Sequence, residues 1–141
     1  GVPEEDISTI LMADHGLKLY GNAVIVNTDY AKNNSDMVKK FLVAIGAGWR
    51  DAIKDPKAAA AALVKRNPAA DAALEQRRLQ LAIDANVLTD YVKANGMGGV
   101  DSSRFAAAIE QLSETYEYKA APNAALYFTD EYLPASGISL N

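Results

Sequence analysis

The residues that could carry chemistry gather near the start of the chain, in the stretch "ADHGLKLYGN". Asp14 and the only histidine, His15, directly follow a predicted strand, where α/β sheets collect their ligand groups. Tyr20 and Asn22 add hydrogen-bonding groups on either side of Gly21, which permits close backbone approach. Two interpretations are open: a turn that contacts a polar ligand, and a surface turn in which His15 only makes a hydrogen bond.

Other patterns associated with catalysis or metals are missing from the sequence. There is no cysteine, nucleophile elbow, phosphate loop or histidine pair on one helix. The "GMGG" stretch lacks a preceding strand, so a turn is favoured over a phosphate loop. We therefore expect no catalytic residue, no metal ligand and no cofactor, and we predict that the protein is not an enzyme.

Two further groups of residues have ordinary structural explanations. Glu75, Arg77 and Arg78 fit a solvated helix face with local ion pairs. Trp49 is in phase with Phe41 and Ile45, so we interpret it as a packing residue rather than a stacking platform.

Composition limits the class of protein. A length of 141 residues predicts one module, and a net charge of −4 gives no basic footprint for nucleic acid. Many of the hydrophobic residues are alanines, which favour helices. The longest apolar run, "AAAAALV", is far shorter than the roughly 20 residues of a membrane-spanning helix.

Two segments near the N-terminus are predicted to form strands. "DISTILM", residues 6–12, is rich in β-branched residues, and "GNAVIVNTDY", residues 21–30, is apolar on both faces at its centre. Two apolar faces need cover on both sides. We therefore expect these strands to recruit a second copy of the chain, giving a homo-oligomer, or to associate with a part of the protein that this chain does not include.

Helical patterns follow. The first is predicted over 36–54 with Ser35 or Asn34 as N-cap, and the second begins with Asp55 as cap and Pro56 at its first position. A third should run from Asn67 to Leu88 and bury Leu74 and Leu81. Further helices should start at Thr89 and Asp101, with Gly96 ending the former. The expected core anchors on the apolar stripes are Phe41, Trp49, Phe105 and Ile109.

These segments predict an α+β fold that is mainly α, with two N-terminal strands followed by four or five helices. We expect residues 1–141 to form a single module. Within it, residues 1–30 are a strand and hinge segment, 31–134 the helical part, and 135–141 a tail without fixed structure.

The stretch "LMADHGLKLYGNAVIVNTDYAKNNSDMVKKFLVAIGAGWRDAIKDP" resembles the C-terminal half of periplasmic solute-binding proteins of the nitrate, sulfonate and thiamine-pyrimidine class. The resemblance continues through "LVKRNPAADAALEQRRLQLAIDANVL", "GMGGVDSSRFAAAIEQL" and "TDEYLP". It implies a part of a type II periplasmic-binding-protein α/β fold, with the N-terminal half of such a protein not included. It also implies that Asp14, His15, Tyr20, Gly21 and Asn22 are candidate ligand-binding or hinge residues.

The resemblance implies the substrate-binding component of an ABC importer, or a fragment of one. Its partners would be a small organic solute and an ABC permease, and its location periplasmic or exported. The enzyme branch of the family uses a histidine and a cysteine-rich motif that this sequence does not contain. Two alternatives stay open: a non-catalytic, self-associating helical module, and a protein related to thiamine-pyrimidine biosynthesis. The sequence does not name the solute.

Overall fold

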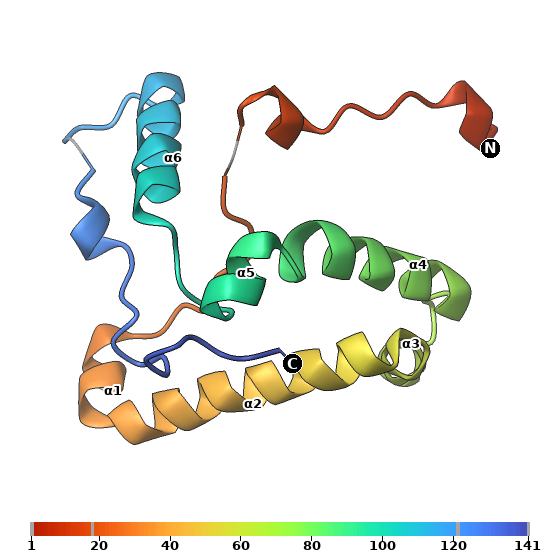
Figure 1. Ribbon diagram of the computed structural model, residues 1–141, viewed down its shortest axis with the longest axis horizontal. Helices are drawn as coiled ribbons and strands as arrows, with labels where there is room; N and C mark the ends of the chain where they lie inside the picture. Colours follow the sequence, from red (N-terminus) through yellow and green to blue (C-terminus); the bar gives the residue numbers. More distant parts are fainter. Residues whose placement is uncertain (1, 18, 121, 141) are drawn as a thin grey trace. The chain divides into compact units, whose positions relative to one another are not determined.

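The computed structural model describes residues 2–17, 19–120 and 122–140 (Figure 1). Contacts within the chain group its residues into two compact units. The α6 unit comprises residues 1–25 and 100–129, and the α2 unit comprises residues 26–99 and 130–141. Each unit is described separately below.

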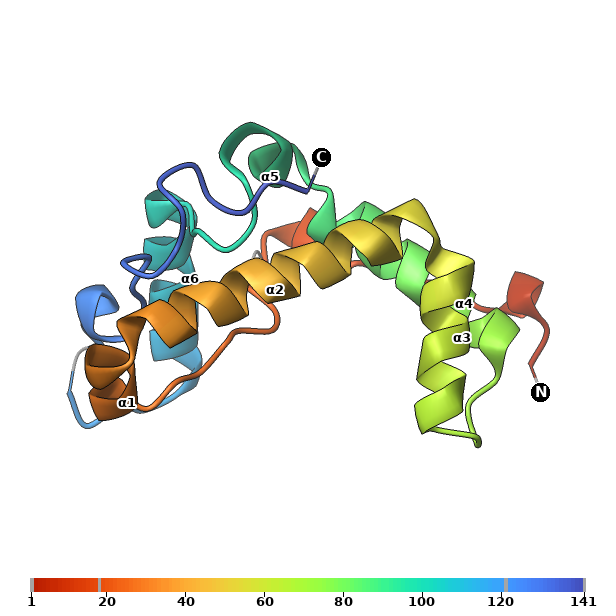
Figure 2. The same cartoon turned by 90° about the horizontal axis from the view of Figure 1, so that it is seen from below.

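The α2 unit is built from consecutive helices. They are α1 (Thr28–Asn33), α2 (Ser35–Lys54), α3 (Pro56–Arg66), α4 (Ala72–Ala82), the five-residue π-helical turn η3 (Ile83–Val87) and α5 (Asp90–Asn95). α3 packs against the end of α2, and α4 packs against α3 (Figure 2). This arrangement places three helices around one region near the C-terminal end of α2.

Side-chain caps explain where several helices begin. The Asp55 carboxylate accepts a hydrogen bond from the Ala58 amide at 2.9 Å, and Pro56 occupies the first position of α3, as the sequence predicted. Thr89 caps α5, which ends at Gly96 with φ of 76°. The cap of α4 is Asp71, four residues after the predicted Asn67. The intervening "NPAA" segment forms a turn because Pro68 follows the end of α3.

The predicted cap of α2 was wrong in position. A short helix, α1, precedes it, and Asn27 caps α1 by accepting from the Asp29 and Tyr30 amides at 3.0 Å each. Asn34 makes no capping hydrogen bond to α2, and its side-chain amide donates to the Tyr30 carbonyl instead. The chain is thus already helical before Ser35, where the sequence predicted the first helix to begin.

The core of the α2 unit forms between α1, the first half of α2 and the C-terminal segment. Ala31, Val38 and Tyr132 are buried together, with Leu42 packed against them. Farther along α2, Gly46 faces the buried side chain of Ile138, where a β-carbon would collide with its methyl group. The C-terminal segment therefore covers one face of α2 (Figure 1).

The C-terminal segment is tied down by backbone pairing as well. Ile138 and Met97 exchange two backbone hydrogen bonds of 2.8 and 2.9 Å in an isolated antiparallel bridge. The Arg50 guanidinium donates to the Ser139 carbonyl at 2.8 Å. Residues 135–140, for which the sequence predicted no fixed structure, make these contacts with α2 and the loop after α5.

The predicted core anchors are less buried than the sequence suggested. Phe41 is 54% exposed and Met37 57% exposed, because the C-terminal segment packs over Val38, Leu42 and Gly46. Leu81, expected to be buried, is 68% exposed. Leu74 is exposed too. Trp49, Phe105 and Ile109 are half-buried.

The predicted α+β fold class was wrong. The described residues form helices without a sheet, so the chain is all-α, and the expected part of a type II periplasmic-binding-protein α/β fold is not present in it. Residues 7–11 and 21–27 form no helix and no strand, and Ile7, Ile10 and Ile25 are exposed. A strand needs a partner to complete its hydrogen bonds, and no described segment pairs with these residues.

The α6 unit contains one longer helix and three short 3₁₀ turns. They are η1 (Glu4–Asp6), η2 (Met12–His15), α6 (Ser102–Thr115) and η4 (Ala124–Leu126). A helix starts at Asp101 as predicted, and its carboxylate caps α6 by accepting from the Arg104 amide at 2.7 Å. Phe105 of α6 packs edge-to-face between the rings of Tyr20 and Phe128. None of the helices in the described parts of the chain is long and apolar enough to cross a membrane.

Candidate functional site

The candidate turn begins with η2, a single 3₁₀ turn that contains Asp14 and His15. The Asp14 amide donates to the Leu11 carbonyl at 3.0 Å, and the Leu17 amide donates to the Met12 carbonyl at 3.1 Å. Gly16 ends the turn with φ of 94°, a conformation that glycine adopts without a steric penalty. The side chains of Asp14 and His15 are both exposed.

Helix α6 holds the segment that follows this turn. The Gln111 side chain donates to the Gly16 carbonyl at 2.9 Å, and the Arg104 guanidinium donates to the Leu19 carbonyl at 2.8 Å. Gln111 and Arg104 lie two helical turns apart on α6. Two backbone carbonyls of the segment are thus attached to one helix face.

Tyr20 completes the attachment at the N-terminus of α6. The Asp101 amide donates to the Tyr20 hydroxyl oxygen at 2.8 Å, and the hydroxyl lies 3.4 Å from the Asp101 carbonyl oxygen, to which it donates. The Arg104 guanidinium carbon lies 4.6 Å from the centre of the Tyr20 ring, within cation–π range. Tyr20 is therefore held by both its ring and its hydroxyl group.

The carboxylate of Asp101 accepts two short hydrogen bonds at the start of α6. The Ser103 hydroxyl donates to its carboxylate at 2.6 Å, and the Arg104 amide donates at 2.7 Å. These hydrogen bonds hold the pKa of Asp101 below its ordinary value because they stabilise the charged form. Asp101 therefore stays ionised at the start of α6, where negative charge is favourable.

The five predicted site residues thus lie on one continuous segment but differ in their surroundings. Asp14, His15 and Asn22 present exposed side chains that make no hydrogen bond or ion pair with other described residues. Gly21 is exposed, and a β-carbon there would meet nothing within 4 Å. Tyr20 is half-buried and points back to α6. Three side chains are free to meet a ligand, and Tyr20 positions the segment that carries them.

Sequence reasoning did not identify the residues that support the segment. Asp101 was predicted only as the start of a helix, and its contact with Tyr20 joins residues 81 positions apart. Arg104 and Gln111 resemble any polar residues on an exposed helix face, so nothing in the sequence marks them.

The chemistry open to this segment is hydrogen bonding. A neutral imidazole offers one donor and one acceptor, a carboxamide offers both, and a carboxylate accepts. No cluster of three or more potential metal-ligating side chains occurs among residues 2–17, 19–120 and 122–140. The arrangement suits the capture of a small polar molecule.

Comparison with known proteins adds one finding. No curated protein and no solved structure matches the chain. The model of one protein family matches residues 3–59, which include the whole candidate segment and all of α1 and α2. That family is described as NMT1/THI5 like, so the resemblance to the nitrate, sulfonate and thiamine-pyrimidine binding class is confirmed over residues 3–59.

Proposed function

We propose that this chain is the substrate-binding component, or part of one, of an ABC importer for a small organic solute. The observation that carries the proposal is the family match over residues 3–59, which contains every candidate residue of the segment 14–22. The proposed solutes are a thiamine pyrimidine precursor, a sulfonate or nitrate. The proposed partner is an ABC permease, and the proposed location is the periplasm.

The geometry supports binding rather than catalysis. His15 and Asn22 are exposed on a segment that α6 holds at Gly16, Leu19 and Tyr20. A fixed backbone lowers the entropy lost when the two side chains close on a ligand. In this proposal His15 and Asn22 bind the solute, Asp14 lies next to His15 in the sequence, and Tyr20 anchors the segment to α6.

The single histidine makes the proposal directly testable. Proton NMR should show one imidazole spin system, and its chemical shift should move saturably when an aminopyrimidine, an alkanesulfonate or nitrate is added. Asn22→Ala should weaken that binding about three- to tenfold, since one hydrogen bond is lost. Asn33→Ala, an exposed position in the α2 unit, is the matched control. Unchanged His15 resonances with all three solutes would refute the proposal.

A second candidate is a self-associating helical module. Its supporting observation is the exposure of Ile10, Met12 and Ile25, at 69%, 60% and 93%. Runs of exposed apolar side chains mark interaction surfaces in proteins that are otherwise well packed. A second copy of the chain that covers residues 7–12 and 22–26 would remove this exposure.

The test of this second candidate is molar mass by light scattering across a range of concentrations. Self-association predicts a mass above 15.1 kDa that falls on dilution. Ile25→Lys should shift the equilibrium toward the monomer, whereas Val2→Lys, exposed but outside both segments, should not. A constant monomer mass at all concentrations would exclude self-association.

A further inference from the structure

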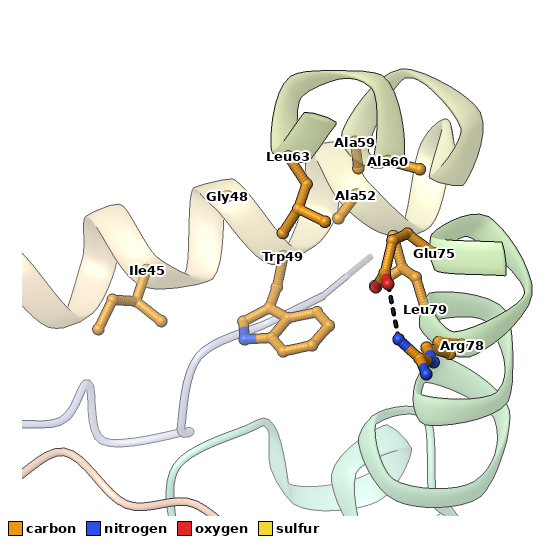
Figure 3. A pocket seen from close by; sticks show the side chains of 10 residues that line it. All are labelled: Ile45, Gly48, Trp49, Ala52, Ala59, Ala60, Leu63, Glu75, Arg78 and Leu79. Carbon is orange, nitrogen blue, oxygen red and sulfur yellow. Dashed lines mark hydrogen bonds and ion pairs between the residues drawn. The ribbon is translucent and has the colours of Figure 1, made fainter. Parts of the chain in front are cut away.

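A surface cavity of about 480 Å³, largely open to solvent, lies on the α2 unit where α2, α3 and α4 meet (Figure 3). Its apolar walls include Ile45 of α2, Leu63 of α3 and Leu79 of α4. None of the residues that line the cavity belongs to the segment 14–22, because all of them are in the α2 unit. Ligand pockets in proteins commonly have volumes of roughly 300–1,000 Å³ and mostly apolar walls.

Small residues create this space. Gly48 and Ala52 of α2 and Ala59 and Ala60 of α3 line the space with side chains of little volume. Longer side chains at these positions would fill the gap, as protein interiors usually do. The alanine-rich sequence of α3 thus leaves room beside Trp49.

Trp49 supplies an aromatic surface in that room. Its indole projects from α2 across the cavity toward α4, with Leu63 on another side (Figure 3). Trp49 is half-buried, so part of the ring is open to an incoming molecule. The sequence favoured a packing role for Trp49, whereas in the structure its indole borders a space that no other described side chain of the unit fills.

A neutral polar pair borders the same space on α4. Arg78 donates to a Glu75 carboxylate oxygen at 2.7 Å, and Glu75 is the less exposed partner, at 21% against 64% for Arg78. The second Glu75 oxygen can still accept, and the other guanidinium N–H groups of Arg78 can still donate. The pair therefore offers an acceptor and a donor side by side with little net charge.

These features restrict the ligand. An uncharged, flat, fused-ring heterocycle matches the indole in area and stacks on it in an offset arrangement. An amino group next to a ring nitrogen on its edge matches the acceptor of Glu75 and the donors of Arg78. We propose that this cavity binds a purine-type base that carries such an amino group. This proposal does not depend on the solute-binding role given to residues 14–22.

Trp49 is the only tryptophan in the chain, so its fluorescence reports on this cavity alone. Adenine added to the whole chain should quench it saturably, with N-acetyltryptophanamide as the reference for collisional quenching. Purine, which lacks the amino group, should bind about three- to tenfold more weakly because one hydrogen bond is missing. Quenching by adenine that matches the free reference compound would overturn the proposal.

Two variants with matched controls locate the binding. Ala59→Leu should fill the cavity and weaken adenine binding at least about tenfold, whereas Ala62→Leu on an exposed face of α3 should leave it unchanged. Glu75→Ala should abolish the preference for adenine over purine, and Gln76→Ala should keep it. Equal effects of Ala59→Leu and Ala62→Leu, or a preference that survives Glu75→Ala, would contradict the assignment.

Other occupants give different results. If a second copy of the chain fills the cavity, Trp49 fluorescence depends on protein concentration without ligand, which would overturn the proposal. The solute-binding role is measured separately at His15, in the α6 unit. A negative result from Trp49 fluorescence therefore says nothing about solute binding at His15, and a negative result at His15 says nothing about the cavity.

Discussion

At the scale of single residues, Tyr20 shows how one side chain joins distant parts of the α6 unit. Its hydroxyl oxygen accepts from the Asp101 amide, and its ring contacts Phe105 and Arg104. The Asp101 amide lies at the N-terminus of α6, where backbone donors have no partner within the helix. Tyr20 thus satisfies one of these donors and fixes the end of the candidate segment.

We predict that Tyr20→Phe lowers the free energy of unfolding by about 1 kcal/mol, because the Asp101 amide loses its protein partner while the ring contacts remain. Tyr20→Ala should cost more, since the contacts with Phe105 and Arg104 are lost as well. Urea denaturation measures both values. Tyr30→Phe, at a position that is 48% exposed, is the control and should have little effect. Equal stabilities of Tyr20→Phe and Tyr20→Ala would show that the ring contacts contribute nothing.

Asp101 gives a prediction for pH dependence. Its pKa is lower in the folded chain than in the unfolded chain, mainly because the Ser103 hydroxyl and the Arg104 amide donate to the carboxylate. Its stabilising contribution is therefore complete above the unfolded value of about 3.9 and is lost as the pH falls through the folded value. Asp101→Asn, which can still cap, should unfold with a weaker acid dependence than the parent chain. Identical dependence of the unfolding midpoint between pH 5 and pH 2 would contradict this.

At the scale of elements, caps decide where the helices start and tertiary contacts decide which face is buried. Asn27, Asp55, Asp71, Thr89 and Asp101 each accept from backbone amides at a helix start. The apolar stripe of α2 is wide, with Met37 and Phe41 on one side and Val38 and Leu42 on the other. The C-terminal segment covers the second side, so the first stays exposed.

The corrected cap of the first helix is testable. Asn27→Ala should lower stability by about 1 kcal/mol, because two amides of α1 lose their acceptor. Ser35→Ala should change it little, since Ser35 is inside the helical run and makes no capping hydrogen bond. Circular dichroism melting curves compare the two variants. A larger loss of stability from Ser35→Ala than from Asn27→Ala would contradict this assignment and favour the cap at Ser35 that the sequence predicted.

At the scale of the whole molecule, the α2 unit depends on its C-terminal segment. Ile138 is 5% exposed and lies against Gly46, and its backbone pairs with Met97. Gly137 has φ of 68°, and a β-carbon there would collide with the Asn95 carbonyl. The segment is therefore fitted closely to α2 and to the loop after α5.

Ile138→Ala should destabilise the chain by about 2 to 5 kcal/mol, because a buried side chain is removed and a cavity remains. Ile25→Ala, at a position that is 93% exposed, should change stability by less than about 0.5 kcal/mol. Chemical denaturation of both variants provides the measurement. Comparable stabilities of the two variants would show that the C-terminal segment does not contribute to the fold.

The sequence by itself determined the local features of this protein. The helices that begin after Asp55 and Thr89 were predicted at their caps, because capping depends on residues within four positions of each other. The start of α6 at Asp101 was predicted from its apolar stripe. The resemblance to the solute-binding class was predicted over nearly the whole chain, and the family model matches it over residues 3–59. These features need no knowledge of distant contacts.

Only the tertiary structure decided the rest. Residues 7–11 and 21–27 have the composition of strands, but β-structure requires a pairing segment, and the described residues provide none. The exposure of Phe41, the contact between Tyr20 and Asp101, and the space beside Trp49 all depend on which distant segments pack together. Hydrophobic periodicity marks an apolar face but does not name its partner, so these outcomes were fixed by packing between residues far apart in the sequence.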